Sequence, residues 1–483
     1  MVVNSINFWL FFLIFLIPYF TLFRKFTKVQ NTWLLIASYV FYGLADWKML
    51  PLLAVVTGLY YILGIVIAKN NSSNPKRASW LTTLGVVVGV GVLLYFKYFD
   101  FFITEFARLF NSIGIHVNVS SFNIIMPIGI SFFIFKLMSY PIEVHRENII
   151  PSRDPVQFAA YVSFFPTILS GPIDKPNTFL PQMAKSRYFC EDDFSEGIKR
   201  VIWGMFLKMC IADRLSPWTD AILNNYSHHN ATSICLAAVL YMIQMYADFC
   251  GYSDMAIGVS RIMGFRVTEN FKRPFFAQNI AEYWRRWHIS LTSWITNYIF
   301  MPLNVAFRSW QPWGLYLATV INLVVIGAWH GANWTFVLFG LYHGFLLVIV
   351  TTLEKRRKKI EKEHNLKNNE IYKWSRRLLT FILCVIGALL FRSASATDFF
   401  ATLGNLSRGF GRIYREGLIE MVVLGVPSIL IMFFKEFKDE YKKNIHFMHS
   451  ENTIVRIVSI VAIISYIIFM GALDGGQFIY FQF

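Results

Sequence analysis

The densest group of ionisable residues in this sequence lies in the middle of an otherwise apolar chain, in EYWRRWHISLTSW, residues 282–294. Glu282, Arg285, Arg286 and His288 fall within seven residues, and tryptophans are threaded between them. Guanidinium groups pair well with phosphates, and an imidazole can exchange a proton near neutral pH. The stretch therefore carries residue types suited to proton transfer and to binding an anionic group.

We expect residues 282–294 to form a single helix. At 100° per residue, one face carries Glu282, Arg285, Arg286 and Ser293, and the opposite face carries Trp284, Trp287, Leu291 and Trp294. A charged side chain at the centre of a bilayer costs ~2.5–3.5 kcal/mol, so this helix cannot face lipid along its length. The pattern alone leaves two interpretations open: an amphipathic helix at the membrane surface, or a helix that lines a polar cavity.

His330 is the second candidate for chemistry, within the apolar sequence INLVVIGAWHGANWTFVLFGLYHGFLLVIV, residues 321–350. The two apolar arms on either side of it are together too long for one membrane-spanning helix, which predicts a break near His330 and Gly331. A lone histidine on an apolar helix is usually a packing residue, and we interpret His343 in that way. At a break, with Asn333 three residues on, a neutral imidazole could instead accept a proton from a hydroxyl group.

The composition predicts an all-α polytopic membrane protein. The chain has 483 residues, of which 55% are hydrophobic and 15% charged, whereas soluble domains carry about 25% charged residues. The net charge of +16 comes from basic residues between apolar runs, which favours membrane topology over a nucleic-acid partner and leaves a polyanionic partner as the alternative. Five scattered cysteines without a CxxC pair predict neither a metal site nor a disulfide framework.

We expect one membrane domain, residues 1–483, with about ten to twelve crossings and some re-entrant or interfacial helices. The candidate spans are 6–23, 31–45, 48–68, 80–98, 122–141, 156–171, 195–213, 232–262, 314–330, 333–353, 378–392, 417–434 and 453–472. Polar residues are expected to break 232–262, where Asp248 and Asp254 are interpreted as packing partners or helix breakers. SFFPTILSGPI, residues 163–173, predicts a broken span or sharp turn.

Basic loops predict the orientation. Basic residues follow the first and third spans, fill residues 354–377 and precede the last span. Placing these loops in the cytosol, with 354–377 as a basic cytosolic loop, leaves both termini outside. No clear internal repeat is present, which argues against an inverted-repeat transporter.

Four segments that occur in a fixed order resemble the membrane-bound O-acyltransferase family, in its bacterial polysaccharide-acetylating branch. They are YVSFFPTILSGPI, YADFCGYSDMAIG, NFKRPFFAQNIAEYWRRWHISLTSWI and GAWHGANWTFVLFGLYHG. The resemblance extends from about residue 5 to the C-terminal FIYFQF. The sequence departs from the family in NYIFMPLNVAFRSW, residues 297–310, which lacks the Gly-Gly-Asn-Arg turn that family members often carry. We therefore assign no binding role to residues 304–309.

The resemblance implies a shell of helices around a central tunnel, in the inner, cytoplasmic membrane of a bacterium. It places the family's catalytic histidine on His330 and a second functional histidine on His288. It also implies substrate-binding roles for Arg285, Arg286, Asn333 and Trp329, no metal and no bound cofactor. Acetyl-CoA would be the acyl donor, and an extracytoplasmic SGNH-type esterase-like protein would be the partner that modifies a polysaccharide such as alginate or peptidoglycan.

Two other functions remain open at this level. The same family also includes D-alanyl transfer to teichoic acid, which would use a carrier-protein thioester as donor. A secondary transporter or lipid flippase would also place histidines and arginines inside the membrane, but it would not consume a thioester.

Overall fold

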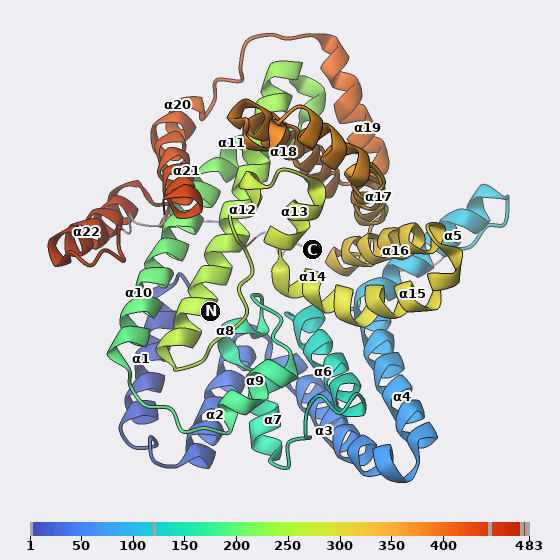
Figure 1. Ribbon diagram of the computed structural model, residues 1–483, viewed down its shortest axis with the longest axis vertical. Helices are drawn as coiled ribbons and strands as arrows, with labels where there is room; N and C mark the ends of the chain where they lie inside the picture. The colour runs from blue at the N-terminus through green and yellow to red at the C-terminus, as the bar shows by residue number, and fades with distance from the viewer. Residues whose placement is uncertain (1–2, 119–121, 443–446, 474–477, 479–483) are drawn as a thin grey trace. The chain divides into compact units, whose positions relative to one another are not determined.

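The computed structural model describes residues 3–118, 122–442, 447–473 and 478, and every regular element in them is a helix (Figure 1). A helix satisfies its own backbone hydrogen bonds, which is the condition for an apolar chain to cross lipid. The all-α class is therefore confirmed. The last five residues of the C-terminal FIYFQF sequence, 479–483, lie outside the described residues.

Eight helical stretches within the described residues are long and apolar enough to cross a membrane. They are Thr27–Ser73, Pro75–Ser112, Ala231–Ile262, Trp313–His330, Trp334–Glu363, Glu370–Arg392, Leu418–Tyr441 and Thr453–Met470. Thr27–Ser73 contains two helices joined by a short 3-10 turn, and the apolar Ile6–Phe20 helix is shorter. The polytopic architecture is confirmed, whereas the number of ten to twelve crossings stays a prediction.

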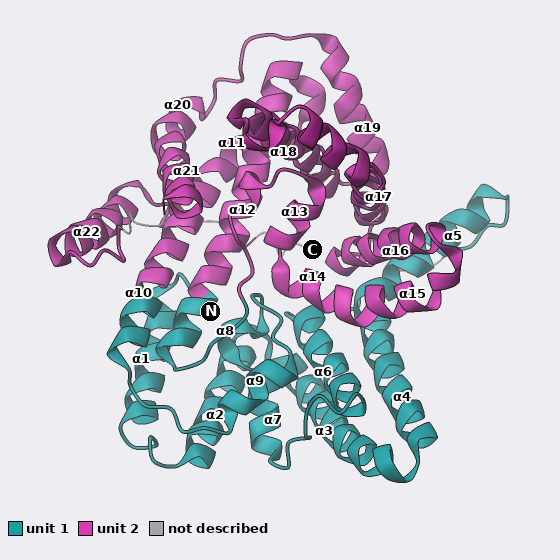
Figure 2. Ribbon diagram, viewed as in Figure 1, with its two compact units in different colours: residues 1–198, 256–268 teal, residues 199–255, 269–483 magenta. Residues whose placement is uncertain are grey.

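The chain divides into two compact units, coloured separately in Figure 2. Unit 1 comprises Met1–Ile198 and Ala256–Thr268, and unit 2 comprises Lys199–Met255 and Glu269–Phe483. Two helices, α10 (Glu191–Phe206) and α12 (Ala231–Ile262), contribute residues to both. All the candidate site residues belong to unit 2, while the prediction of a single membrane domain stays a prediction.

Unit 1 contains the N-terminal helices. They are α1 (Ile6–Phe20), α2 (Thr27–Asp46), α3 (Leu50–Ser73), α4 (Pro75–Leu93), α5 (Phe99–Ser112), α6 (Ile130–His145), α7 (Pro155–Val162), α8 (Phe165–Ile168) and α9 (Pro176–Met183). Helices α3, α4 and α6 pack tightly because glycines replace larger side chains at their contacts. A Cβ on Gly89 of α4 would lie 2.4 Å from the Met138 side chain of α6.

The break predicted in SFFPTILSGPI is confirmed. Helix α7 ends at Val162, the short α8 covers Phe165–Ile168, and an irregular segment follows through Gly171. Irregular backbone away from water needs polar partners, and side chains of the unit supply them. The Ser38 hydroxyl accepts a hydrogen bond from the Phe165 N–H.

Unit 2 contains the remaining helices. They are α11 (Asp213–Leu223), α13 (Ile280–Arg286), α14 (Ile289–Ile295), α15 (Met301–Ala306), α16 (Trp313–His330), α17 (Trp334–Glu363), α18 (Glu370–Arg392), α19 (Ala396–Gly404), α20 (Leu418–Glu420), α21 (Val426–Tyr441) and α22 (Thr453–Met470). Helices α16 and α17 form a close hairpin, since a Cβ on Gly327 would lie 2.1 Å from the Phe336 carbonyl oxygen. This hairpin fixes the position of His330 at its turn.

The expected interruption of the segment 232–262 is wrong, because α12 is one continuous helix of 32 residues. Its acidic residues do not break it, since each pairs with a cation from α10 or the π-helical segment that follows α10. Asp248 lies 2.7 Å from the Lys208 ammonium group, and Asp254 lies 2.7 Å from the Arg200 guanidinium. Their interpretation as packing partners is therefore supported by these ion pairs.

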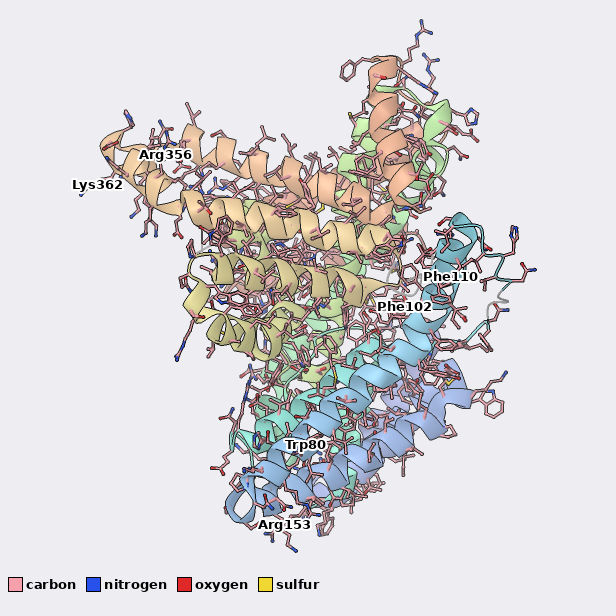
Figure 3. All side chains as sticks on the ribbon, turned by 90° about the vertical axis from the view of Figure 1, so that its right-hand side faces the viewer. Trp80, Phe102, Phe110, Arg153, Arg356 and Lys362 are labelled. Carbon is pink, nitrogen blue, oxygen red and sulfur yellow. The ribbon has the colours of Figure 1, made fainter. Side chains whose placement is uncertain are left out.

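Most of the basic segment 354–377 is helical. Helix α17 continues to Glu363 and α18 begins at Glu370, so only a short turn separates them. Ion pairs at i,i+4 spacing run along the α17 extension, including Lys358 with Glu354. Figure 3 shows Arg356 and Lys362 projecting from this end of the hairpin. The cytosolic location of the segment stays a prediction.

The same view labels aromatic side chains on α4 and α5 of unit 1 (Figure 3). Trp80 and Phe102 are 76% and 56% exposed. Large exposed aromatic side chains are a liability in water but suit a helix that contacts lipid and the interface. Their exposure is therefore consistent with the membrane character of the chain.

Candidate active site

His288 occupies a sharp turn between two short helices, so the prediction of one helix over 282–294 is wrong. Helix α13 ends at Arg286, Trp287 is extended, and α14 begins at Ile289. His288 itself adopts the left-handed conformation, with φ 43° and ψ 53°, which is uncommon for a residue other than glycine. Such a conformation persists only where the surroundings hold it.

The segment that begins at Asn270 holds this turn. The Ile289 N–H donates to the Asn270 carbonyl oxygen, and the Lys272 N–H donates to the Arg286 carbonyl oxygen, each at 2.9 Å. These bonds replace the helical hydrogen bonds that a continuous 282–294 helix would have made. Hydrogen bonds with the segment that begins at Asn270 therefore override the helical pattern of residues 282–294.

Asn270 is a positioning residue that sequence reasoning missed. It is fully buried, and its Oδ1 accepts a hydrogen bond from the Ser290 hydroxyl at 2.9 Å. Its amide nitrogen donates to the Ser253 hydroxyl of α12 at 3.0 Å. Asn270 thus ties the start of α14 to α12. The only signal in the sequence is its place at the head of the stretch NFKRPFF, where an asparagine has no evident helical role.

The His288 imidazole is buried among aromatic rings. It is 1% exposed, and its ring lies 4.6 Å from the Phe249 ring centroid and 5.6 Å from the Trp329 ring centroid. Burial lowers the pKa of His288 well below its usual value near 6.5, and the neighbouring His330 lowers it further. The ring is therefore neutral at physiological pH.

His330 is the last residue of α16, and the predicted break after it is confirmed. The chain is extended at Gly331 and helix α17 begins at Trp334. A Cβ on Gly331 would lie 2.4 Å from the Phe336 ring, so no larger residue fits here without displacing that ring. His330 is 7% exposed, and its ring lies 5.0 Å from the Phe391 ring of α18.

The two predicted catalytic histidines, 42 positions apart in the sequence, meet in the fold. Their ring centroids are 6.4 Å apart, at an interplanar angle of 48°. Trp329 contacts both, with ring centroids at 5.6 Å from His288 and 5.2 Å from His330. The two imidazoles therefore lie close to each other inside an aromatic enclosure.

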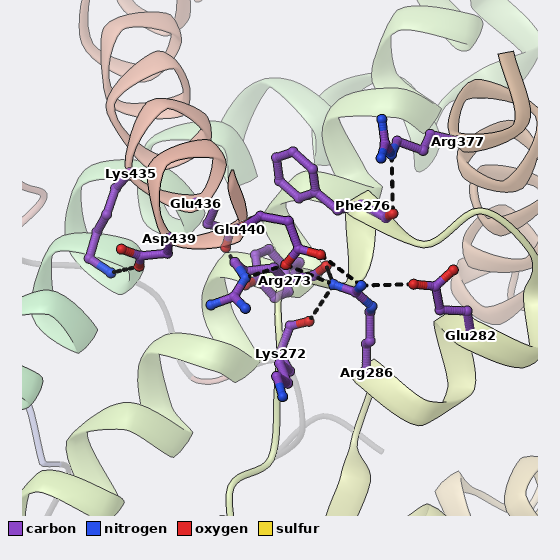
Figure 4. A network of polar contacts seen from close by, with 11 residues as sticks. Lys272, Arg273, Phe276, Glu282, Arg286, Arg377, Lys435, Glu436, Asp439 and Glu440 are labelled. Atoms are coloured by element: carbon purple, nitrogen blue, oxygen red, sulfur yellow. Dashed lines mark hydrogen bonds and ion pairs between the residues drawn. The ribbon is translucent and has the colours of Figure 1, made fainter. Parts of the chain in front are cut away.

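Arg286 is committed to contacts within the protein (Figure 4). Its guanidinium pairs with Glu282 of its own helix at 2.7 Å and with Glu440 of α21 at 2.8 Å. Glu440 also pairs with Arg273 at 2.7 Å. Burial opposes the charge of Arg286, but the hydrogen bonds to Glu440 raise its pKa above the ordinary value. Arg286 therefore anchors α13 to α21.

Arg285, by contrast, is exposed on α13. Adjacent helical positions point in directions about 100° apart, so the side chains of Arg285 and Arg286 face different surroundings. The two arginines, to which the sequence analysis gave the same role, therefore differ in their contacts. Arg285 is the one whose guanidinium faces outward.

Asn333 caps helix α17. Its Oδ1 accepts from the Thr335 N–H at 3.0 Å, and its Nδ2 donates to the Ala394 carbonyl oxygen at 2.8 Å. Both ends of the amide therefore hold the turn after His330. In the part of the chain that the structure describes, no group of three or more His, Cys, Asp or Glu side chains could hold a metal ion.

The fold and this site define a multi-pass, all-helical membrane protein with a buried histidine pair. The membrane-bound O-acyltransferase family matches residues 21–391, and the chain belongs to that family. It is therefore an O-acyltransferase.

This chain is similar in sequence to proteins that are named for three different activities. The chain is 37% identical, over 366 residues, to the probable alginate O-acetylase AlgI of Azotobacter vinelandii, covering 76% of this chain and 70% of that protein. It is 30% identical, over 343 residues, to the peptidoglycan O-acetyltransferase of Helicobacter pylori, covering 66% and 63% of the two chains. It is 31% identical, over 277 residues, to the teichoic acid D-alanyltransferase of Bacillus subtilis, covering 55% and 66%.

Proposed function

We propose that this protein transfers an acetyl group from cytosolic acetyl-CoA, through the membrane, to an extracytoplasmic acceptor or partner for O-acetylation of a cell-surface polysaccharide. The observation that carries the proposal is the buried pair of histidines, with ring centroids 6.4 Å apart at the ends of two broken helices. The names of the relatives at 37% and 30% identity support acetyl as the group and alginate or peptidoglycan as the acceptor pathway.

In the proposed reaction His330 is the general base. Its neutral imidazole accepts the proton of an acceptor hydroxyl while that oxygen attacks the thioester carbonyl carbon. The carbon–sulfur bond then breaks, and the coenzyme A thiolate takes the proton back. Attack by the imidazole itself, with the acetyl group carried transiently on His330, is the alternative route.

His288 would act on the developing oxyanion or orient the donor. Its pKa is lowered by burial, so it offers a neutral N–H rather than a cation. Trp329 would form the wall between the two imidazoles. Asn333 would act indirectly, because its amide holds the turn that presents His330.

Arg285 is the proposed contact for the phosphates of the donor. It is exposed, whereas Arg286 is engaged by Glu282 and Glu440. A guanidinium binds phosphate oxygens in a bidentate manner. On the opposite side of the membrane, an SGNH-type partner protein would receive the acetyl group and pass it to the polymer.

The first test replaces His330 with alanine. We expect loss of acetyl transfer by at least about 100-fold, since general-base catalysis contributes roughly 10²–10⁴-fold. The measurement is release of the coenzyme A thiol from acetyl-CoA by purified protein in proteoliposomes. His364→Ala, an exposed histidine beyond the end of α17, is the matched control and should keep full activity.

Two outcomes would contradict the proposal. Full activity of the His330→Ala protein, with an unchanged melting temperature, would remove His330 from the chemistry. Turnover of a D-alanyl carrier-protein thioester but not of acetyl-CoA would favour the second candidate, which the similarity to a teichoic acid D-alanyltransferase keeps open.

A further inference from the structure

Aromatic rings pack around His330, and three phenylalanines among them have no role in the proposed reaction. They are Phe336 and Phe339 of α17 and Phe391 of α18, and their ring centroids lie 6.3, 6.2 and 5.0 Å from that of His330. The Trp329 ring lies at 5.2 Å. Aromatic rings in direct contact have centroids about 4.5–7 Å apart. These four side chains therefore pack directly on the imidazole.

The three phenylalanines also pack on one another. The Phe391 ring centroid lies 4.9 Å from that of Phe336 and 5.5 Å from that of Phe339, and both pairs meet edge to face. All three side chains are buried, and α17 and α18, from which they come, pack against each other. Because protein interiors are close-packed, such a group of rings resists the insertion of further atoms.

Two of these rings are fixed by their other neighbours. A Cβ on Gly331 would lie 2.4 Å from the Phe336 ring, so this ring lies directly against the backbone of the turn. The Phe339 ring centroid lies 4.7 Å from that of His343. Phe391 contacts both fixed rings, and it is the closest of the three to the imidazole of the proposed base.

The proposed reaction brings the acyl group to these rings. The His330 imidazole contacts the acceptor hydroxyl at about 2.6–3.2 Å, and that oxygen attacks the thioester carbonyl carbon from about 3–3.5 Å. On the alternative route the carbonyl carbon contacts the imidazole itself. On either route the carbonyl carbon lies within roughly 7 Å of His330, which is the distance range of the phenylalanine rings. The substituent on that carbon therefore meets them.

The aromatic group favours a small apolar substituent. The methyl group of an acetyl thioester gains from burial among apolar rings. Each further methylene would have to displace a packed ring, and overfilling a close-packed interior is unfavourable. Such a difference of one methylene changes kcat/KM by about 10–200-fold. A charged substituent such as the succinyl carboxylate would be buried among apolar rings, which is more costly still.

We propose that Phe391, supported by Phe336 and Phe339, limits the transferred acyl group to two carbon atoms. The inference deepens the proposed function and rests on it, because it assumes that acyl transfer takes place at His330. Phe391 is then a specificity-determining residue. It contacts the substituent of the thioester carbonyl and takes no part in the proton transfer.

The test compares acetyl-CoA, propionyl-CoA and butyryl-CoA as donors for the purified full-length protein in proteoliposomes. The measurement is kcat/KM for release of the coenzyme A thiol from each donor. We expect the unmodified protein to prefer acetyl-CoA to propionyl-CoA by about tenfold or more, and to use butyryl-CoA less than either. Phe391→Leu and Phe391→Ala leave space for another methylene, so each should lower this preference at least about fivefold.

Phe381→Ala is the matched control on the same helix. The Phe381 ring packs against Phe275, with ring centroids 5.3 Å apart, and neither residue is among the rings around His330. This variant should keep the preference for acetyl-CoA even if its melting temperature falls. If the Phe391 variants do not fold, Phe339→Leu supplies the measurement, and it should lower the preference in the same way.

An unchanged or increased preference for acetyl-CoA in a folded Phe391→Leu protein would overturn the inference. Equal use of butyryl-CoA and acetyl-CoA by the unmodified protein would overturn it as well, because no limit on chain length would then exist. That second result would leave acetyl-CoA as a donor and so would not contradict the proposed function.

Failure of the proposed donor has a different signature. If the unmodified protein releases coenzyme A from none of the three donors, the same acyl groups are offered as carrier-protein thioesters. A preference for the two-carbon group that Phe391→Leu reduces would retain the limit and reject coenzyme A as the carrier. Transfer of all three groups at equal rates would reject both.

Discussion

The backbone of His288 is strained at the turn between α13 and α14. A non-glycine residue in the left-handed region costs on the order of 1–3 kcal/mol. Asn270 accepts hydrogen bonds from the Ile289 N–H and the Ser290 hydroxyl, and these bonds hold the flanking residues and so offset this cost. The turn directs the imidazole toward Trp329 and His330 instead of along a helix face.

The buried His288 should make the protein sensitive to acid. Its pKa is lowered in the folded protein, so below about pH 6.5 the unfolded chain binds a proton that the folded protein does not. Stability should therefore fall as the pH falls, by up to about 1.4 kcal/mol per pH unit from this group. The measurement is the melting temperature in detergent between pH 7.5 and pH 5.

His288→Asn should reduce this acid-induced fall, because asparagine tolerates the left-handed conformation and does not titrate. His364→Asn, at an exposed position, should leave the fall unchanged. Identical pH slopes for the unmodified protein and His288→Asn would show that His288 is charged in the folded protein.

At the scale of elements, two helix breaks bring the histidines together. The α16–α17 hairpin is fixed by glycine contacts, and its turn is capped by Asn333. The α13–α14 turn is fixed by the extended segment after α12 and by the ion pairs of Arg286. Contacts with other elements therefore hold both turns, in addition to the helices on which the histidines lie.

The two adjacent arginines of α13 should therefore respond differently to substitution. Arg286→Ala removes the ion pairs with Glu282 and Glu440 and should lower the free energy of unfolding by about 1–3 kcal/mol. Arg285→Ala should leave stability unchanged and raise the apparent KM for acetyl-CoA several-fold. The measurements are melting temperature and steady-state kinetics on both variants.

A reversed pattern would overturn the assignment of these roles. If Arg285→Ala were the destabilised protein, the ion-pair network of Figure 4 would not describe the anchor of α13. If Arg286→Ala alone impaired donor use at full stability, the phosphate contact would belong to Arg286.

For the whole molecule, the basic residues predict which ends of the helices face the cytosol. Lys362 lies on the exposed extension of α17, and Arg412 lies in the segment between α19 and α20. In a variant with the five native cysteines replaced by serine, a membrane-impermeant maleimide should label Arg412→Cys in intact spheroplasts. Lys362→Cys should be labelled only after lysis, and the opposite result would invert the predicted topology.

The sequence could predict the features that depend on composition and on the length of apolar runs. The helical class follows from the cost of exposing backbone groups to lipid. The break after His330 follows from the lengths of the apolar arms, and the break in SFFPTILSGPI follows from its proline and glycine residues. The family resemblance supplied the two histidines. The local sequence pattern gave wrong predictions at 282–294 and at 232–262. In both segments, hydrogen bonds or ion pairs with residues distant in the sequence determine the backbone conformation.

The sequence by itself thus determined that this chain is an apolar helical protein of its family, because hydropathy and residue order are local properties. Only the tertiary structure decided that His288 lies in a left-handed turn, that Arg286 is an anchor, and that the buried Asp213 pairs with Lys208. Each of these depends on hydrogen bonds and ion pairs between residues far apart along the chain, and no local pattern encodes such contacts.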